Sequence, residues 1–174
     1  MAAIGNILVD ASSVAMRYAK RLTSDIPSDK FGRLATPGGV LVQSNHPAFV
    51  IGHLALYPSK AMHLLKLDLG TTNPSERFVA VFSKDSSCID DSSGATYPAK
   101  DELWQFFDQA YTAVRQSIRE ASDELLLSAT ADDSPMKSLF PTVGAMLAFY
   151  IDGHVLMHLG QLSAWRRMQG MLPV

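Results

Sequence analysis

Two histidines one helical turn apart stand in an apolar stretch near the end of the sequence. The segment reads "DGHVLMHLGQLSAWRR" and contains His154 and His158. On a helix, residues four apart lie on one face, so both imidazoles can reach a single point. Imidazole nitrogen is a common ligand of divalent metal ions. Two core histidines with hydrogen-bond partners would also fit this spacing, because buried polar groups are nearly always paired.

A seam of residues with spacings of four and three runs through both histidines. Its members are Leu147, Ile151, His154, His158, Gln161 and Trp165. Such a seam is typical of the inward face of a helix in a bundle, so we expect both imidazoles to point at the core. Two stacked imidazoles on an apolar seam would find few side chains as hydrogen-bond partners. One metal ion, in contrast, would accept a lone pair from each imidazole.

A metal site would need a third ligand from another helix, and three histidines remain for it. His46, His53 and His63 all fall on the second predicted helix. His46 precedes His53 by about 10 Å along the helix axis and His63 follows it by about 15 Å, so at most one of the three can share the ion. We expect His53, in the body of the helix beside Gly52, to be the one. Spacing alone leaves metal binding and satisfied core histidines both open.

Four segments have the apolar periodicity of amphipathic helices, and no pair of segments alternates as paired strands do. They run from about Ala3 to Thr23, from Asn45 or His46 to about Leu67 with a kink at Pro58, from Pro98 to about Ser122, and from Thr142 to Gly170. The pattern predicts an all-α fold, a four-helix bundle in a single domain over residues 1–174. The connection over about 68–96, which contains "RFVAVF", predicts a long crossover that makes helices two and three parallel.

Composition and charge exclude several classes of protein. A net charge of −2 and a pI of about 6.2 offer no broad basic surface for nucleic acid. The amino-terminal stretch is interrupted by Asn6 and Asp10, so it predicts neither a signal sequence nor a membrane span. The single cysteine builds no disulfide framework, and we expect a cytoplasmic protein. Cys88 stands among aspartates that would raise the pKa of its thiol, which makes it a poor nucleophile.

Other kinds of catalytic site lack their required residues. A carboxylate-bridged di-iron bundle needs Glu-x-x-His elements, and no histidine follows any of the four glutamates by three positions. Two histidines on one turn cannot bind opposite faces of a haem. The chain has no G-x-S-x-G element, and "TPGGVLV" lacks the lysine of a phosphate loop. These absences leave the histidines as the main chemical signal.

Three stretches of the chain resemble the DinB-like superfamily, also called DinB/YfiT-like. They are "NHPAFVIGHLALY", "YPAKDELWQFF" and "HVLMHLGQLSAWRRMQGMLP", and the resemblance covers nearly the whole chain. Its most specific part pairs GHL on the second helix with H-x-x-x-H-x-G-Q-L on the fourth. The resemblance implies a four-helix bundle with a long link between helices two and three. It also implies a divalent metal ion held by His53, His154 and His158.

The resemblance carries expectations about activity and assembly. Three protein ligands leave a position open for water or substrate, as in catalytic zinc sites. Imidazole suits zinc, nickel, copper or iron, and we expect zinc or nickel, although the sequence does not choose. Because characterised relatives include thiol-dependent S-transferases and isomerases, we expect a homodimeric, metal-dependent enzyme acting on a small molecule by thiol transfer or hydrolysis, with a low-molecular-weight thiol as partner. The alternative is a non-catalytic dimeric module that binds metal or ligand.

Two further residues are candidates beside the ion, and no catalytic acid, base or nucleophile is predicted. Gln161 is a candidate to hydrogen-bond a ligand, although a polar residue closing a layer of the bundle would look the same. Arg166 is a candidate for binding an anionic substrate, although cations in the last turn of a helix commonly complement its dipole. His46 and His63 are predicted as surface or capping histidines. Trp104, Phe106 and Phe107 are predicted core residues.

Overall fold

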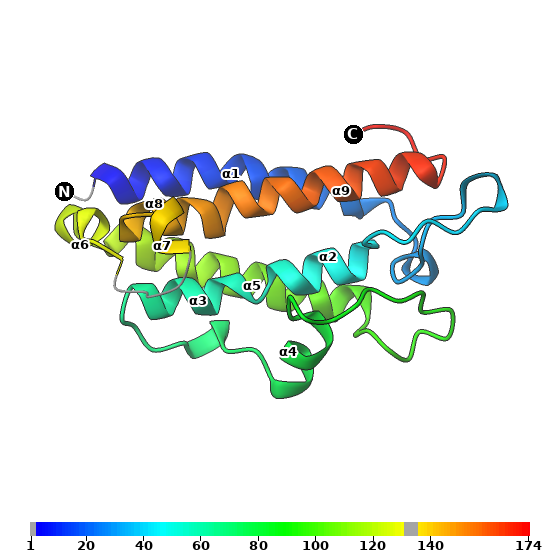
Figure 1. Ribbon diagram of the computed structural model, residues 1–174, viewed down its shortest axis with the longest axis horizontal. Coiled ribbons are helices and arrows are strands. Elements are labelled where there is room, and N and C mark those ends of the chain that lie inside the picture. The colour runs from blue at the N-terminus through cyan, green and yellow to red at the C-terminus, as the bar shows by residue number, and fades with distance from the viewer. Residues whose placement is uncertain (1–2, 131–135) are drawn as a thin grey trace.

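The prediction of an all-α fold is confirmed by a computed structural model that describes residues 3–130 and 136–174 (Figure 1). Within these residues the chain forms helices and no strand, and the only β-type pairings are the isolated bridges Ala35–Val42 and Ala129–Thr142. The α-helices are α1 (Ala3–Ser24), α2 (Pro47–Leu54), α3 (Tyr57–Leu64), α4 (Glu76–Phe82), α5 (Lys100–Glu120), α6 (Asp123–Leu127), α7 (Met136–Leu139), α8 (Val143–Ala148) and α9 (His154–Met168).

The long helical segments lie side by side along the length of the molecule. In Figure 1, α1 and the run from α8 to α9 go from left to right, whereas α2, α3 and α5 go from right to left. The chain returns from the end of α3 to the start of α5 through residues 65–99, which include α4 and the short 3-10 turn η3 (Gly70–Thr72). This connection acts as a crossover, since α3 and α5 run in the same direction.

Small residues allow α1 and α5 to pack closely. The inward face of α1 carries Gly5, Ser12, Ala15 and Ala19, all buried. A Cβ added at Gly5 would clash with the carbonyl of Ile118 on α5. The buried face of α5 supplies apolar side chains at helical spacing, most of them larger, which are Leu103, Phe107, Ala110, Tyr111, Val114 and Ile118. The predicted core position of Phe107 is confirmed, while Trp104 and Phe106 are half-buried at its edge.

The second predicted helix is broken into α2 and α3. His46 caps α2, since its Nδ1 accepts the backbone N–H of Phe49 at 3.2 Å. Pro58 has no N–H to continue the helix, and its ring would clash with the carbonyl of Leu54 four residues earlier. Accordingly α2 ends at Leu54 and α3 begins one residue before the proline. The predicted kink is therefore an interruption of the helix at Ala55 and Leu56, which keep right-handed helical backbone angles.

The predicted fourth helix contains a π-helical turn that its sequence pattern did not reveal. Thr142 caps α8 through its Oγ1, which accepts the N–H of Ala145 at 3.2 Å. The turn η4 (Phe149–Gly153) then joins α8 to α9. A π turn inserts one extra residue into the helix and shifts the register of the faces on its two sides. The combined run Val143–Met168 is long and apolar enough to cross a membrane, a test that a buried core helix also meets.

The crossover places one short helix against α2. Ser75 caps α4 by accepting the N–H of Phe78, and the helix ends in the fully buried Phe82. "RFVAVF" is therefore helical. The Phe82 ring lies over Gly52, where an added Cβ would collide with it. Only glycine at this position admits the ring, so the backbone of α4 comes close to the middle of α2.

Candidate metal centre

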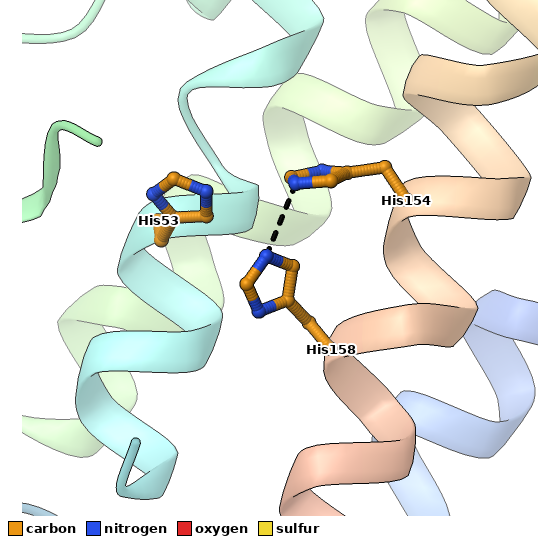
Figure 2. A group of neighbouring side chains, drawn as sticks. All are labelled: His53, His154 and His158. Carbon is orange, nitrogen blue, oxygen red and sulfur yellow. Dashed lines mark hydrogen bonds between the residues drawn. The ribbon is translucent and has the colours of Figure 1, made fainter. Parts of the chain in front are cut away.

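The structure brings together His53, His154 and His158, the three histidines predicted from the sequence. His53 lies on α2, and the other two lie one turn apart at the start of α9 (Figure 2). Each offers a ring nitrogen, and these three atoms lie within 4.8 Å of one another. His53 and His154 are buried, whereas His158 is half-buried. Three imidazoles from two helices therefore converge on one point.

A backbone carbonyl fixes the ring of His53. Its Nδ1 lies 2.8 Å from the carbonyl oxygen of Phe82, at the end of α4. A carbonyl only accepts hydrogen bonds, so the proton is on Nδ1 and the lone pair is on Nε2. The crossover thus sets the tautomer of His53, which leaves Nε2 able to bind a cation.

Hydrogen bonds between side chains fix the tautomer of His158 in the same way. Its Nδ1 lies 3.0 Å from Gln161 Oε1, and Gln161 Oε1 also accepts the Nδ2–H of Asn45 at 3.0 Å. Because Asn45 donates to this oxygen, the amide of Gln161 is oriented with its acceptor toward His158. The Nδ1 of His158 is then the donor, and its Nε2 carries the lone pair.

His154 completes the group through its own Nε2, which lies 3.0 Å from the Nε2 of His158 (Figure 2). Two nitrogens that each bind one ion at about 2.1 Å in tetrahedral geometry would be roughly 3.4 Å apart, so the two hydrogen-bonded rings would have to separate slightly to share an ion. The Nδ1 of His154 is buried and has no hydrogen-bond partner within the described residues. The Tyr57 ring packs against this imidazole, with 4.0 Å between the ring centroids.

Burial keeps all three imidazoles neutral at ordinary pH. It is the largest cause that lowers the pKa of His53, His154 and His158, and the pKa of His154 falls to about 3. The neighbouring imidazoles lower the pKa of His154 and His158 further. A neutral imidazole keeps the lone pair that a metal ion needs. His53 and His158 thus present a lone pair on Nε2, whereas His154 Nε2 must donate the hydrogen bond to His158 and would bind a cation only with its proton on Nδ1.

No protein-family model matches this chain, and no curated protein matches it.

The predicted seam is correct for most of its members and wrong for one. Leu147, Ile151, His154 and Trp165 are buried, but Gln161 is exposed. After η4, the fully buried side chains of α9 are Val155, Leu159, Leu162, Trp165 and Arg166. The core-facing stripe of α9 is therefore shifted by about one residue. The two histidines lie on the edge of that stripe, facing α2.

Arg166, a candidate for binding an anionic substrate, makes its contacts away from the three histidines. Its guanidinium is almost completely buried and forms an ion pair with Asp25, just beyond α1. Nη1 also donates to the carbonyl of Leu22 at 2.8 Å, and Nη2 to that of Leu172 at 3.0 Å. Both terminal nitrogens are thus occupied by acceptors of the protein. Arg166, in the last turn of α9, therefore links this helix to the end of α1.

Cys88, His46 and His63 take no part in the candidate metal centre. Burial is the main cause that raises the pKa of the Cys88 thiol, to about 11, so the sulfur is protonated at neutral pH. His46 is buried and caps α2, with its Nε2 3.0 Å from the carbonyl of Ile89. His63 is exposed. Neither histidine belongs to the cluster.

Sequence reasoning missed several neighbours of the site. Tyr57 follows His53 by four residues, a spacing that could have placed it beside the imidazole. The Phe82 carbonyl and Asn45 had no such signal, because each comes from a connecting segment whose path only the fold decides. Lys60 lies with its Nζ 4.4 Å from the centre of the Tyr57 ring and was also missed.

Proposed function

We propose that this chain is a DinB-like four-helix bundle that binds a divalent metal ion through His53, His154 and His158 and acts on a small molecule. α1, the broken pair α2–α3, α5 and the run from α8 to α9 would be the four helices, with residues 65–99 as the crossover. The observation that carries the proposal is the convergence of three neutral imidazoles, two of them with their tautomers set by acceptors.

The protein supplies the position, the protonation state and the surroundings of the ligands. When bound, the ion would act as a Lewis acid that favours the deprotonated form of a thiol or water in its open position. Phe82 and Gln161 hold His53 and His158 in the required tautomers. The ring of Tyr57 covers His154 and limits access of water on that side. The described residues offer no competing nucleophile at the centre, so we propose that the nucleophile is exogenous.

Zinc and nickel are the ions we propose first, and a matched set of variants tests the binding. Purified protein stripped of metal is titrated with zinc or cobalt against a competing chelator. We expect one ion per chain. His154→Ala should lower the affinity by more than about 100-fold, beyond the loss expected for an outer hydrogen-bond partner. The exposed His63→Ala should leave it unchanged. Equal affinities of the two variants would contradict the site.

The reaction class is tested with an electrophile such as an epoxide or a halogenated aromatic. Conversion is measured with several low-molecular-weight thiols, with none, and after chelation. Thiol transfer predicts turnover that needs both metal and thiol, whereas hydrolysis predicts turnover that needs metal alone. Both should survive Cys88→Ala and be lost in His154→Ala. Metal binding without turnover of any substrate would favour the non-catalytic binding module.

We also propose a cytoplasmic homodimer. Apolar side chains are exposed on two helices in contact with each other, Ile7 and Val14 on α1 and Leu156 and Met157 on α9. Exposed apolar residues on neighbouring helices favour association when they form a continuous surface. Light scattering at micromolar protein should give twice the chain mass, and Met157→Glu should lower it. A monomer mass for the wild type would contradict the dimer.

A further inference from the structure

An open cavity of about 370 Å³ lies beside the hydrogen-bonded side chains that hold His158. The segment just before α2 and one face of α9 form its walls, and the lining residues are Gln43, Ser44, Asn45, Gln161, Ala164 and Met168. Its volume is within the range of small-molecule sites in proteins. Gln161 both lines this cavity and accepts the hydrogen bond from His158. The cavity and the candidate metal centre are therefore linked through one side chain.

The lining of the cavity is polar but uncharged. Among the described residues, no charged side chain lines it. Its polar groups are three side-chain amides and the hydroxyl of Ser44, while Ala164 and Met168 supply apolar surface. A charged ligand would find no group of opposite sign here and would lose part of its hydration. The lining therefore favours a neutral polar molecule with a short apolar part.

The amides at the wall have unused hydrogen-bonding capacity. Both lone pairs of Gln161 Oε1 are occupied, by the Nδ2–H of Asn45 and the Nδ1–H of His158, each at 3.0 Å. Gln161 Nε2 and Asn45 Oδ1 make no hydrogen bond within the described residues. The Oγ of Ser44 is buried and also lacks a partner there. The wall thus presents free donors on Gln161 next to a free acceptor on Asn45.

A primary amide complements this pair of groups. Its carbonyl oxygen can accept from Gln161 Nε2 while its own N–H donates to Asn45 Oδ1. A carboxylate could only accept and an ammonium group could only donate, so each would leave one of the two groups without a partner. Ala164 and Met168 would contact the apolar part of the molecule, since the flexible thioether of methionine adapts to varied shapes.

We propose that this cavity binds a small neutral molecule that carries a primary amide, and that its occupation strengthens metal binding by the three histidines. Donation from Nε2 of Gln161 makes its Oε1 a better acceptor, because linked hydrogen bonds reinforce one another. A bound amide would also hold the exposed Gln161 in the orientation that His158 requires. The effect on metal binding rests on the proposed function, whereas binding in the cavity does not.

Three five-carbon compounds test the binding. They are pentanamide, pentanoate and pentylamine, which end in a neutral amide, an anion and a cation. Metal-free protein is titrated with each, and the changes in its NMR chemical shifts give the dissociation constants. Ala164→Leu fills the cavity from an exposed position on α9, and Gln161→Glu keeps the acceptor for His158 but loses the N–H donors. The matched control is Ala80→Leu at an exposed position on α4.

We expect the wild type to bind pentanamide at least about fivefold more tightly than pentanoate or pentylamine, since a single hydrogen bond contributes on this scale. Ala164→Leu and Gln161→Glu should each weaken pentanamide by about fivefold or more, and Gln161→Glu should favour pentylamine instead. Ala80→Leu should bind as the wild type does. Equal binding of the three compounds, or unchanged binding of pentanamide in both cavity variants, would overturn the site.

The effect on the metal centre is measured by chelator competition for zinc, with and without saturating pentanamide. Pentanamide should raise the zinc affinity of the wild type by about fivefold, and zinc should raise the pentanamide affinity by the same factor, because linkage is reciprocal. Neither effect should occur in Ala164→Leu. An unchanged zinc affinity with pentanamide bound would overturn the coupling. Failure of the wild type to bind zinc would overturn the proposed function and the coupling with it, while pentanamide binding would still support the cavity site.

Discussion

Each imidazole of the candidate metal centre is set by a different neighbour. A backbone carbonyl binds Nδ1 of His53, a side-chain amide binds Nδ1 of His158, and an aromatic ring covers His154. The first two neighbours decide which nitrogen carries the proton. Removing either should weaken metal binding while leaving all three ligands in place.

Gln161→Leu tests the role of the amide. The variant removes the acceptor for Nδ1 of His158 and the partner of Asn45. We expect metal affinity to fall by roughly 10- to 100-fold, the range seen for loss of such partners. Because Gln161 is exposed, thermal stability should change little. The exposed Gln105→Leu on α5 is the control. Identical chelator competition curves for the two variants would show that Gln161 does not orient His158.

Gly52→Ala tests the close approach of α4 to α2. The added Cβ would collide with the ring of the fully buried Phe82, whose carbonyl holds His53. Overpacking of this kind costs about 1–3 kcal/mol of stability. We also expect weaker metal binding, because the carbonyl must move with the ring. Gly160→Ala on α9 has open space around its Cβ and should be neutral or stabilising. Thermal melts of the two variants compare these outcomes directly.

At the scale of helices, Arg166 joins the end of α9 to the end of α1. Its guanidinium is buried and binds Asp25, whose side chain is half exposed, together with the carbonyls of Leu22 and Leu172. α1 and α9 both run toward the end of the molecule opposite α6 (Figure 1), and the ion pair links the two segments there. An isolated surface ion pair contributes little, but a buried cation that loses its anion is costly.

Asp25→Ala should therefore destabilise the fold by about 2 kcal/mol, since it leaves a buried guanidinium with fewer partners. Asp10 forms a comparable pair with Arg119 at an exposed site, with 70 % of the Asp10 side chain exposed. Asp10→Ala should cost less than about 1 kcal/mol. Urea unfolding of both variants gives the comparison. Similar losses would show that the burial of Arg166 does not matter.

At the scale of the whole molecule, several groups make folding sensitive to acid. Burial lowers the pKa of His46 from 6.5 to about 4, despite the nearby Asp90 and Asp91. Hydrogen bonds lower the pKa of Asp25, where the donor is Arg166, and of Asp90, where it is Arg33. In the unfolded chain all these groups would bind protons at higher pH than in the folded chain. Stability must therefore fall as the pH decreases.

The contribution of His46 is complete above about pH 6.5 and is lost as the pH falls toward 4. The shift corresponds to roughly 3 kcal/mol. We expect the free energy of unfolding of metal-free protein to decrease across this window, and to decrease less in His46→Asn. The variant keeps a capping oxygen for α2 but has no imidazole to protonate. The other histidines contribute equally to both proteins and cancel in the difference. Parallel pH profiles would contradict this assignment.

Local patterns in the sequence were sufficient to predict the main helices and the shared face of two of the three histidines, His154 and His158. Apolar spacing gave the bounds of α1 to within one residue and those of α5 to within two, while Pro47 and Thr142 marked the starts of α2 and α8. The spacing of His154 and His158 fixed their shared face, because four residues make about one helical turn. His53 was chosen among three histidines by its place within a helix, a choice that the observed cluster agrees with.

Only the tertiary structure decided what surrounds those ligands. The π turn at Phe149–Gly153 shifted the core stripe of α9, which exposed Gln161 and buried Arg166. Periodicity could not reveal this, because a π turn has no strong composition of its own. The Phe82 carbonyl and Asn45 reach the centre from other segments, through contacts between residues distant in sequence. The sequence by itself determined which atoms can bind a metal ion, since donor chemistry and helical spacing are local. Their protonation, burial and surrounding charge depend on packing, which only the folded chain defines.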